Sequence, residues 1–575
     1  MSDTHGRRTF VFGLDGATLD LMLPWVREGR LPNLARLMAD GAHGKLRSTI
    51  HPMTAQAWTS FMTGKNLGKH GLVDFFMRRP GTYELQIVNA SSREGETIWG
   101  ILSQAGKRVG ILNVPMTYPP EPINGFLVAG MDTPTLGTQF TQPPHLKEEL
   151  LKAVPAYRIE PGGHRPVPGD ERRSREFIEE TWQAAEARFE ATTYLMERYP
   201  WDFFMVVFRA TDRVQHWFWK HMDPQHPLRI PGDEKYSDVI LRTYQRMDEM
   251  LGHFIEGIGH GVNVLVVSDH GAIPIGHKVI YLNTWLAQEG LLKFKSDAGA
   301  GALDGNTLVS GSLWRLWRRM KRSLPADGRR ALKRAFPRLE RKVTSRLTFA
   351  DIDWMQTQAY AMEQREAVWI NLQGREPQGR VKPGEEYERL RDEIIQKLMG
   401  FADPETDQPI VERVYKREEL YHGPHLDEVP DLLLCLAESG YRYRLARHDP
   451  ARERKQAIEI LGSHQLMTDY RASAGHALDG VCIFRGEGIR AGYELEGAHI
   501  MDMAPTILHL MGEAVPNDMD GRVLEEIFDP QFLASHPIAF RDVQPRQSGD
   551  IAQRTYASED EQEVLERLQG LGYLD

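Results

Sequence analysis

The stretch that most constrains this chain is VNVLVVSDHG, at residues 262–271. Its four consecutive apolar residues, 264–267, form a run of the kind that a strand buried on both faces shows in a parallel sheet. The run ends at Ser268, Asp269 and His270. Ligands of open α/β sheets gather at the carboxyl ends of the strands, so a carboxylate beside an imidazole there predicts a metal site. The same residues would also fit a turn that caps the next helix.

The first predicted strand, residues 9–14, also ends in a carboxylate, that of Asp15. No glycine-rich nucleotide fingerprint follows it, and Asp15 could instead cap the next helix. A helix predicted at residues 55–62 begins beside Thr54, where a threonine often serves only as a cap. The same geometry puts its hydroxyl next to free backbone N–H groups that favour a phosphate. Beside metal ions, that hydroxyl could attack phosphorus.

A second buried strand is predicted at residues 203–208, and Asp212 and His216 follow it at i and i+4. On a helix both side chains face the same way, which suits a divalent metal and equally suits an Asp–His hydrogen bond. His476 lies in a predicted loop just before a strand at residues 480–484. A single histidine in a loop is weak evidence for a metal ligand. His476 is a candidate because the other candidate residues accompany it.

The alternation of strand and helix patterns predicts an α/β fold with a doubly wound, mostly parallel sheet flanked by helices, a helical insertion and a small cap subdomain. We expect the core in two parts, residues 1–295 and 431–540. Between them we expect a basic helical insertion at 296–350 and the cap subdomain with the return to the core at 351–430. A tail and helix follow at 541–575. Residues 313–347 of the insertion are rich in arginine and lysine. These residues could form a solvated helical segment that covers part of the core. Alternatively, they could form a surface that attracts an anionic substrate or makes peripheral contact with anionic lipid headgroups.

Composition excludes several classes of protein. The 575 residues carry a formal net charge of −10, which does not favour binding to nucleic acid. The two cysteines, Cys435 and Cys482, lie in apolar runs and read as buried thiols rather than a disulfide or a cysteine metal site. No stretch approaches the ~18 apolar residues of a membrane span, and no signal peptide is recognisable, so a cytoplasmic location is expected.

The candidates together comprise three carboxylates, three imidazoles and one hydroxyl, nearly all at or just past the ends of predicted strands: Asp15, Thr54, Asp212, His216, Asp269, His270 and His476. Six ligands make two sites of three, each with room for substrate or water, which is the open pattern of catalytic metals. Two neighbouring metals can activate an attacking oxygen and stabilise a leaving one, as phosphoryl transfer requires.

The set and its order resemble the alkaline phosphatase superfamily, and within it the type I phosphodiesterase/nucleotide pyrophosphatase branch. The stretches that carry the resemblance span nearly the whole chain: GLDGA at 13–17, the Thr54 helix running to MTGKNLGKHG, TDRVQH at 211–216, SDHG at 268–271, SAGHALDG at 473–480, MDMAPTILHLMG at 501–512 with the following VPNDMDGRVL, and a terminal LGYL. Similar bacterial proteins are described only as predicted phosphohydrolases or phosphomutases, so no substrate follows from the resemblance.

The resemblance implies an alkaline phosphatase-like fold and a role for each candidate. One metal would take Asp212, His216 and His476, and the other Asp15, Asp269 and His270. Thr54 would be the nucleophile and form a phospho-threonine that water then hydrolyses. Zinc is the expected ion because of the three imidazoles, and manganese is the alternative because related phosphomutases use it.

Two departures from the family pattern bear on the substrate. Nucleotide pyrophosphatases usually carry an asparagine after the His-Gly that follows the nucleophile helix, and here HGLVDFF places Asp74 or Phe75 there. An aspartate would repel a phosphate unless it is paired, which puts nucleotide substrates in doubt. Arg209, Lys69 and Lys278 are candidates for the missing contact. TAQAW at 54–58 lacks the proline and arginine of the sulfatases, which argues against that class.

The sequence therefore predicts a two-metal phosphohydrolase acting on a small-molecule phosphate ester, most simply a phosphodiesterase. A phosphomonoesterase or phosphomutase of the same superfamily is one alternative, and a metal-containing binding protein without turnover is the other. The oligomeric state is left open.

Overall fold

The computed structural model describes residues 7–571 except for 163–164, 168, 296–348, 350–351, 363–364, 438–440, 447–455, 463–471, 544–555 and 557. The predicted basic insertion at 296–350, with its stretch at 313–347, lies outside the described residues except for residue 349. The expectations for these segments stay predictions.

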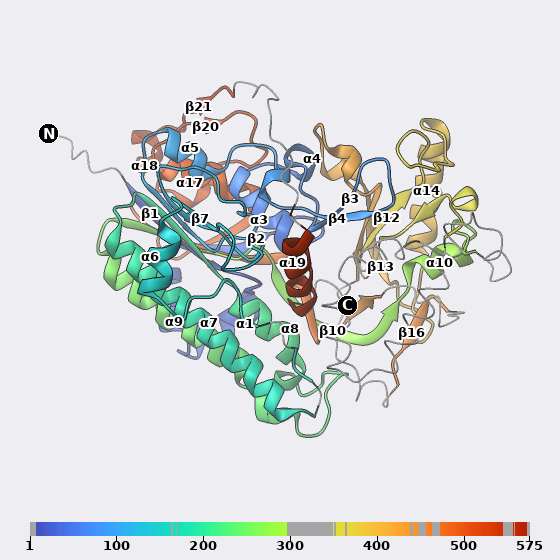
Figure 1. Ribbon diagram of the computed structural model, residues 1–575, viewed down its shortest axis with the longest axis horizontal. Helices are drawn as coiled ribbons and strands as arrows, with labels where there is room; N and C mark the ends of the chain where they lie inside the picture. Colours follow the sequence, from blue (N-terminus) through green and yellow to red (C-terminus); the bar gives the residue numbers. More distant parts are fainter. Residues whose placement is uncertain are drawn as a thin grey trace.

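A nine-stranded sheet forms the centre of the molecule (Figure 1). Its strands run in the order β19 (Tyr493–His499), β2 (Ala42–Arg47), β18 (Asp479–Arg485), β9 (Val262–Val267), β1 (Arg8–Leu14), β8 (Phe203–Phe208), β5 (Val109–Leu112), β6 (Gly125–Val128) and β7 (Thr141–Gln142). The five strands from β9 to β6 are parallel to one another, whereas β18 and β7 are antiparallel to their neighbours. The predicted fold class is confirmed.

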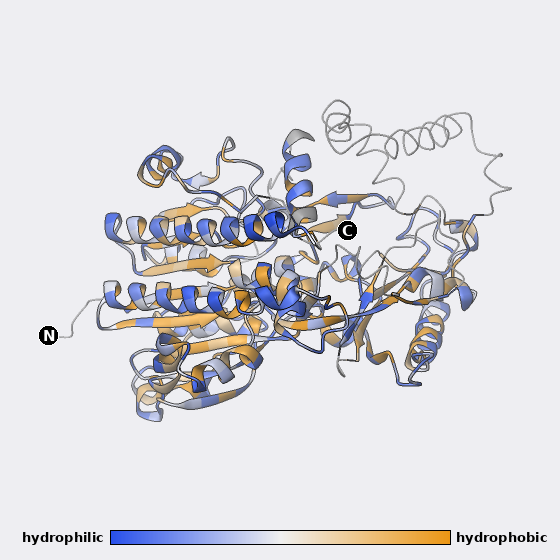
Figure 2. Ribbon diagram, turned by 90° about the horizontal axis from the view of Figure 1, so that it is seen from below, coloured by the Kyte–Doolittle hydropathy of each residue, from blue (hydrophilic) through white to orange (hydrophobic). Residues whose placement is uncertain are grey.

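The central strands are apolar along their whole length because helices cover both faces of the sheet. Residues 264–267 of β9 are each about 1% exposed, and Phe10 and Phe12 of β1 are fully buried. On one face lie α1 (Leu19–Arg27), α2 (Pro32–Ala39), α6 (Leu146–Ala153), α7 (Glu171–Arg198), α8 (Ala210–Met222) and α9 (Val239–Ile258); on the other lie α3 (Thr54–Thr63), α5 (Ile98–Gln104), α17 (Met503–Leu510) and α18 (Pro530–Ser535). Figure 2 shows the apolar sheet between helices whose outward faces are hydrophilic.

A second, smaller body lies beside the C-terminal edge of the large sheet, and we call it the cap. Its four-stranded antiparallel sheet has the order β11 (Ala359–Tyr360), β12 (Ala367–Ile370), β14 (Leu432–Leu436) and β13 (Val411–Lys416). Helices α10 (Leu282–Gln288) and α14 (Glu385–Met399) share its hydrophobic core. Residues 432–436 thus belong to the cap, whereas the sequence placed them at the return to the catalytic core, because an apolar strand alone does not reveal its sheet.

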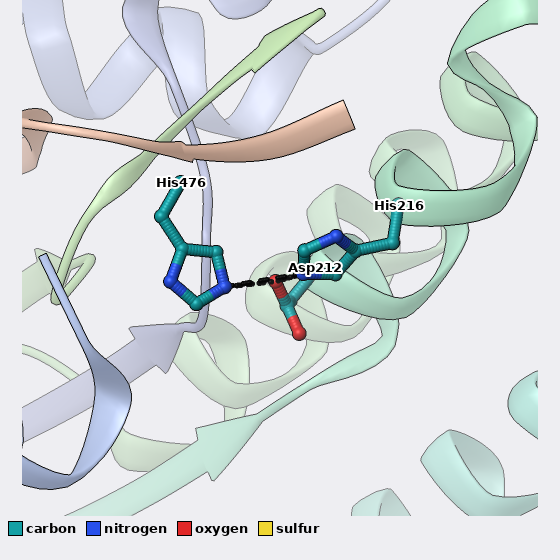
Figure 3. A group of neighbouring side chains, drawn as sticks. All are labelled: Asp212, His216 and His476. Carbon is teal, nitrogen blue, oxygen red and sulfur yellow. Dashed lines mark hydrogen bonds and ion pairs between the residues drawn. The ribbon is translucent and has the colours of Figure 1, made fainter. Parts of the chain in front are cut away.

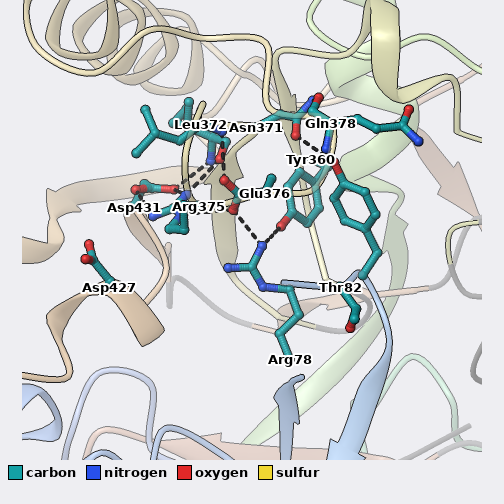
Figure 4. Close-up of polar contacts among 12 residues, drawn as sticks. Arg78, Thr82, Tyr360, Asn371, Leu372, Arg375, Glu376, Gln378, Asp427 and Asp431 are labelled. Carbon is teal, nitrogen blue, oxygen red and sulfur yellow. Dashed lines mark hydrogen bonds and ion pairs between the residues drawn. The ribbon is translucent and has the colours of Figure 1, made fainter. Parts of the chain in front are cut away.

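The buried carboxylate of Asp431 joins the parts of the cap. It accepts hydrogen bonds from Arg375 Nη2 and the Tyr387 hydroxyl, both at 2.6 Å, and from the backbone N–H of Ile370 at 2.6 Å. Arg78, in the hairpin of β3 (Phe76–Arg78) and β4 (Leu85–Ile87), pairs with buried Glu376 at 2.6 Å (Figure 4). This network ties the hairpin of the core to the cap.

A third set of strands connects the two bodies. β10 (Gly271–Ile280) leaves the site edge of the large sheet and pairs with β15 (Arg442–Leu445), β16 (Ile458–Ile460) and β17 (Ala474–Ala477). Residues 277–280 complete β10, because Val279 and Ile280 are buried between two partner strands. His476 was expected in a loop and lies instead in β17, where it is opposite Ala272.

Other local expectations agree with the structure or differ by a few residues. The helix expected from residue 92 begins only at Ile98, because the Thr97 hydroxyl caps it by accepting the N–H of Gly100 at 3.0 Å. Cys482 is buried as expected, whereas Cys435 is half-buried. The terminal amphipathic helix is α19 (Ser558–Leu571), whose Val564 and Leu568 are 1% exposed in a cluster that includes Ala55.

The remaining short elements lie in connections: α4 (Leu67–His70), α15 (Arg417–Leu420), β20 (Val515–Pro516), β21 (Phe540–Arg541), and the 3₁₀ helices η1 (Ala90–Ser92), η2 (Asp233–Tyr236), η4 (Trp354–Gln356), η5 (Leu426–Glu428), η6 (Ile500–Asp502) and η7 (Glu525–Ile527). Among the described helices, none combines the length and apolarity needed to cross a membrane. The expected cytoplasmic location stays a prediction.

Candidate metal centre

The strand order of the large sheet explains why the candidate residues converge. β9, β1 and β8 are adjacent and parallel, with Leu14 opposite Phe208 and Gly13 opposite Val267. Their carboxyl ends therefore lie side by side, and the residues that follow them meet at one edge. Asp15 follows β1, α8 with Asp212 and His216 follows β8, and Asp269 and His270 follow β9.

One group at this edge consists of Asp212, His216 and His476 (Figure 3). The Nε2 atom of His216 lies 3.0 Å from Asp212 Oδ1 and 3.1 Å from His476 Nε2. The Nε2 atom of His476 lies 3.7 Å from the same carboxylate oxygen. Two imidazole nitrogens and an oxygen gathered around one point form a donor set that suits a divalent ion of intermediate softness.

Backbone carbonyls fix the tautomers of these two histidines. His216 Nδ1 donates to the carbonyl of Ala474, and His476 Nδ1 donates to the carbonyl of Pro52, each at 2.7 Å. With a proton held on Nδ1, each ring presents its Nε2 lone pair to the shared point.

A second group consists of Asp15, Asp212 and His270, all buried. His270 Nε2 lies 3.7 Å from Asp15 Oδ1 and 3.5 Å from Asp269 Oδ2. Its Nδ1 donates to the carbonyl of Gly271 at 2.9 Å, so Nε2 faces the carboxylates. Asp269 Oδ1 accepts the N–H of Gly16 at 3.3 Å, which orients its other oxygen. Asp212 thus lies at the junction of the two groups.

Two carboxylate oxygens near His270 have no hydrogen-bond partner among the described residues, Asp15 Oδ1 and Asp269 Oδ2. A buried carboxylate oxygen without a partner is costly, and metal coordination is one of the few ways to satisfy it. The residues present therefore fit a divalent cation.

The electrostatics of the carboxylates agree with this fit. Burial raises the pKa of Asp15 to about 7, although the charge of Arg209 opposes the shift. Burial and the neighbouring charges of Asp15 and Asp212 raise the pKa of Asp269 well above its ordinary value. Burial acts in the same sense on Asp212, but His216, His476 and Arg209 together lower its pKa. Three carboxylates held this closely without water need positive charge to remain ionised.

The histidines respond to the same environment. Burial lowers the pKa of His270 to about 4 and, together with the charge of His270, lowers the pKa of His476 well below its ordinary value. Burial opposes protonation of His216 too, but Asp212 raises the pKa of His216 overall. His270 and His476 are therefore neutral at pH 7, as metal ligands must be.

Thr54 lies next to the second group, at the carboxyl-end edge of the large sheet. It is the first residue of α3, whose cap is Met53, and no side-chain hydrogen bond from Met53 caps the helix. The side chain of Thr54 is fully buried, and its Oγ1 lies 3.4 Å from His270 Nε2. The hydroxyl thus faces the second group at the N-terminus of a ten-residue helix, which is the arrangement that favours a phosphate.

With this geometry in hand, the comparison with known families becomes informative. A family model described as "Type I phosphodiesterase / nucleotide pyrophosphatase" matches residues 9–466. The chain belongs to this family. Its members are phosphoester hydrolases of the alkaline phosphatase superfamily and use two metal ions. The resemblance seen in the sequence is therefore confirmed at the level of the family.

Solved structures agree with the fold assignment. Phosphonoacetate hydrolase from Sinorhizobium meliloti 1021, in complex with phosphonoformate, matches with a TM-score of 0.50 and 15% identity over 87% of this chain and 94% of that one. Murine ectonucleotide pyrophosphatase/phosphodiesterase 5, in an inactive form in complex with AMP, matches with a TM-score of 0.47 and 13% identity over 91% of this chain and all of that one. No curated protein sequence matches the chain.

Arg209 has a different environment from the one expected of a phosphate contact. Its guanidinium lies 3.4 Å from Asp15, 3.3 Å from Asp212 and 3.4 Å from Glu160, and only 2% of its side chain is exposed. Glu160 also pairs with Arg188 at 3.3 Å. Arg209 therefore holds two of the candidate ligands in place and balances part of their charge.

The other candidates for substrate contact are engaged elsewhere. Lys69 Nζ lies 2.6 Å from Asp520, and Lys278 Nζ lies 2.6 Å from Asp403 in the cap. Asp74 is buried and forms an ion pair with Arg365 of the cap. An unpaired aspartate at this position would repel a phosphate, and Asp74 is paired.

Sequence reasoning missed Trp58, Glu160 and Arg365. Trp58 Nε1 donates to Asp15 Oδ2 at 3.3 Å, and its position one helical turn after Thr54 was a signal in the sequence. Glu160 and Arg365 carry no such local signal.

A cavity of about 180 Å³ opens beside the first group, between core and cap. His216 and His476 line it on the side of the core. Arg365 of the cap and Arg442 and Arg444 of β15, whose Tyr443 and Leu445 pack against the cap, line the side that we call the cap side. The cavity is thus bordered by two of the candidate metal ligands, and it is called the site pocket below.

Proposed function

We propose that the protein is a two-metal phosphodiesterase that forms a phospho-threonine on Thr54. The observation that carries the proposal is the position of the Thr54 hydroxyl, 3.4 Å from His270 Nε2 and at the N-terminus of α3. A hydroxyl that is buried against a cluster of carboxylates and imidazoles is a poor structural element and a well-placed nucleophile. Membership of the phosphodiesterase family supports the diester as substrate.

The assignment of ligands follows the two groups. One ion takes Asp212, His216 and His476. The other takes Asp15, Asp269 and His270, and Asp212 lies close enough to contribute to both. Zinc suits the three imidazoles, with manganese as the alternative. Arg209 keeps Asp15 and Asp212 oriented and is not itself a ligand.

The chain's own residues account for the reaction in two steps. When bound, the two cations stabilise an ionised attacking oxygen and the charge on the leaving oxygen. Thr54 Oγ1 forms a bond to phosphorus while the bond from phosphorus to the leaving oxygen breaks, and the hydroxyl proton passes to water. The backbone N–H groups at the start of α3 would hold the non-bridging oxygens. Water then forms a bond to phosphorus, the bond to Thr54 breaks, and Thr54 regains a proton.

The first prediction concerns Thr54. Thr54→Ala should lower kcat on bis-p-nitrophenyl phosphate by at least about 10³-fold, because it removes the nucleophile and leaves the ligands in place. Thr54→Ser keeps a hydroxyl and should retain part of the activity. Elemental analysis of all three proteins should give the same metal content. Activity of the alanine variant equal to that of the wild type would rule out the covalent mechanism.

A paired rate assay on metal-loaded protein separates the alternatives. Faster turnover of bis-p-nitrophenyl phosphate than of p-nitrophenyl phosphate supports the phosphodiesterase. The reverse order supports a phosphomonoesterase or phosphomutase. Metal content of about two ions per chain without turnover of either compound favours a binding protein on the same scaffold.

A further inference from the structure

The cap side of the site pocket is rich in positive charge. Three arginines line it, Arg365, Arg442 and Arg444, against one carboxylate among the described lining residues, that of Glu366. Apolar side chains of Met53, Ile275 and Leu445 complete the wall. The metal centre would contact only the phosphoryl group of the substrate. The arginines on the cap side of the pocket therefore need a separate explanation.

Arg442 is already matched within the protein. Its Nη2 lies 2.6 Å from both carboxylate oxygens of Glu366, and its Nη1 donates to the carbonyl of His476 at 2.6 Å. Arg442 therefore supports the strand that carries a candidate ligand and neutralises Glu366.

Arg365 is arranged differently. Its Nη2 pairs with Asp74, and its Nη1 lies 3.2 Å from the thioether sulfur of Met53, the residue before Thr54. A thioether is a weak acceptor, whereas a guanidinium offers five N–H donors in a planar fork that matches a carboxylate or phosphate. An anionic oxygen in the pocket would be a stronger partner for the side of the fork that now faces sulfur.

Asp74 explains how the arginine of the cap is held there. The side chain of Asp74 is 8% exposed, and its Oδ1 accepts the N–H of Phe75 at 2.6 Å. Asp74 is not among the described residues that line the pocket, whereas Arg365 is. The carboxylate thus does not line the pocket, and an anion bound there would contact the guanidinium of Arg365 and not Asp74.

We propose that Arg365, positioned by Asp74, binds a second anionic group of the substrate, so that the enzyme prefers phosphoesters carrying a carboxylate or a further phosphate beyond the reacting phosphorus. The inference rests on the proposed function and names its substrate class. It also gives Asp74 a role as a positioning residue in place of the amide that related enzymes carry.

The test uses two diesters that differ in one charge, p-nitrophenyl phenyl phosphate and p-nitrophenyl 4-carboxyphenyl phosphate, with all products quantified by chromatography. The wild type should prefer the carboxylated diester by about 10-fold or more in kcat/KM, mainly through KM, because a charge-assisted hydrogen bond forms in a desolvated pocket. Arg365→Gln should bring the ratio close to one, and Arg365→Lys should give an intermediate ratio.

Two further variants make the result specific. Asp74→Asn should reduce the preference by less than Arg365→Gln does, since the arginine remains but loses its anchor. Arg380→Gln is the matched control, because Arg380 is an exposed arginine of the cap outside the pocket lining, and it should leave the ratio unchanged. Turnover of p-nitrophenyl phenyl phosphate, the diester without the carboxylate, shows that each variant is folded.

Equal rates on the two diesters in the wild type, or a preference that persists in Arg365→Gln, would overturn the inference. If Arg365→Gln turns over neither diester, Arg365→Lys becomes the deciding variant. An undiminished preference of Arg365→Lys for the carboxylated diester would count against the proposed role of Arg365 in binding the second anionic group. Calorimetric titration with phenyl phosphate and 4-carboxyphenyl phosphate covers the case without turnover. Tighter binding of the carboxylated compound to the wild type alone then supports the pocket, while the proposed function fails.

Discussion

At the scale of single residues, each candidate histidine is oriented by a hydrogen bond from the ring nitrogen that points away from the carboxylates. His216, His270 and His476 each donate a ring N–H to a backbone carbonyl, so the opposite nitrogen of each ring faces the carboxylates. Such contacts fix both the tautomer and the direction of the lone pair. The ligand atoms therefore need little rearrangement to take a cation.

Asp269 provides the residue-scale prediction for the metals. Asp269→Asn should lose about one metal equivalent per chain and most of the activity, because the neutral amide is a poorer ligand than the buried carboxylate. Asp479→Asn is a suitable control, since the Asp479 side chain is 38% exposed and pairs with Lys45 at 3.5 Å. Elemental analysis after gel filtration measures the content. Full occupancy in Asp269→Asn would refute its role as a ligand.

The sequence alone predicted that the candidate metal ligands lie close together, but it did not predict which residues contact them. Asp15, Asp212, Asp269 and His270 follow apolar runs that identify parallel strands, and the fold brings such strand ends together. Arg365 meets Asp74 through the packing of cap against core, and Glu160 meets Arg209 through packing within the core, neither of which a local pattern encodes. The contacts of Arg209 with Asp15 and Glu160 could not be predicted for the same reason.

At the scale of elements, β10 and β17 show where pattern reasoning loses information. β10 contains Pro274 and Gly276, which weaken a strand signal, and β17 has only four residues. Both are strands because they pair with each other, and β10 also pairs with β15 and β16. This pairing places His476 against the helix that carries His216, so a short element with no sequence signature completes the first group.

The cap sheet gives a prediction about stability. Asp431→Asn should destabilise the protein by about 3–5 kcal/mol, because it breaks a buried ion pair and removes one of the two carboxylates that pair with Arg375, the other being that of Glu376. Asp427→Asn, visible beside it in Figure 4, should change stability by less than about 0.5 kcal/mol, since the Asp427 side chain is 78% exposed. Denaturant unfolding of both variants measures the difference. Equal effects would show that the Asp431 network does not hold the cap.

The 3₁₀ helix η5 gives a prediction about pH. Glu428 and Glu94 raise the pKa of His425 from 6.5 to about 9, so folding favours the protonated form. Its contribution to stability is complete below pH 6.5 and is lost as the pH rises through 9. Partial exposure and screening limit it to about 1 kcal/mol. The melting temperature of the wild type should exceed that of His425→Gln at pH 6 and match it above pH 9. A pH-independent difference would contradict the ion-pair account.

At the scale of the whole molecule, the core and strand β17 supply the candidate metal ligands, the core supplies the proposed nucleophile Thr54, and the cap together with β15 supplies the charged wall of the site pocket. The C-terminal helix α19 packs on the surface beside Thr54, where Val564 and Leu568 share a cluster with Ala55 and Phe75. Segments distant along the chain thus enclose one hydroxyl. This enclosure excludes bulk water from the reacting atoms and strengthens the electrostatic interactions around them.

The central claim is that phosphorus is transferred to Thr54 on its way to water. The most direct measurement is acid quenching of metal-loaded protein during turnover of bis-p-nitrophenyl phosphate, followed by mass spectrometry of the peptide that contains Thr54. The account predicts a nitrophenyl-phosphoryl adduct on Thr54 that is absent from Thr54→Ala. Steady turnover with an unmodified Thr54 peptide, and comparable turnover by Thr54→Ala, would contradict it.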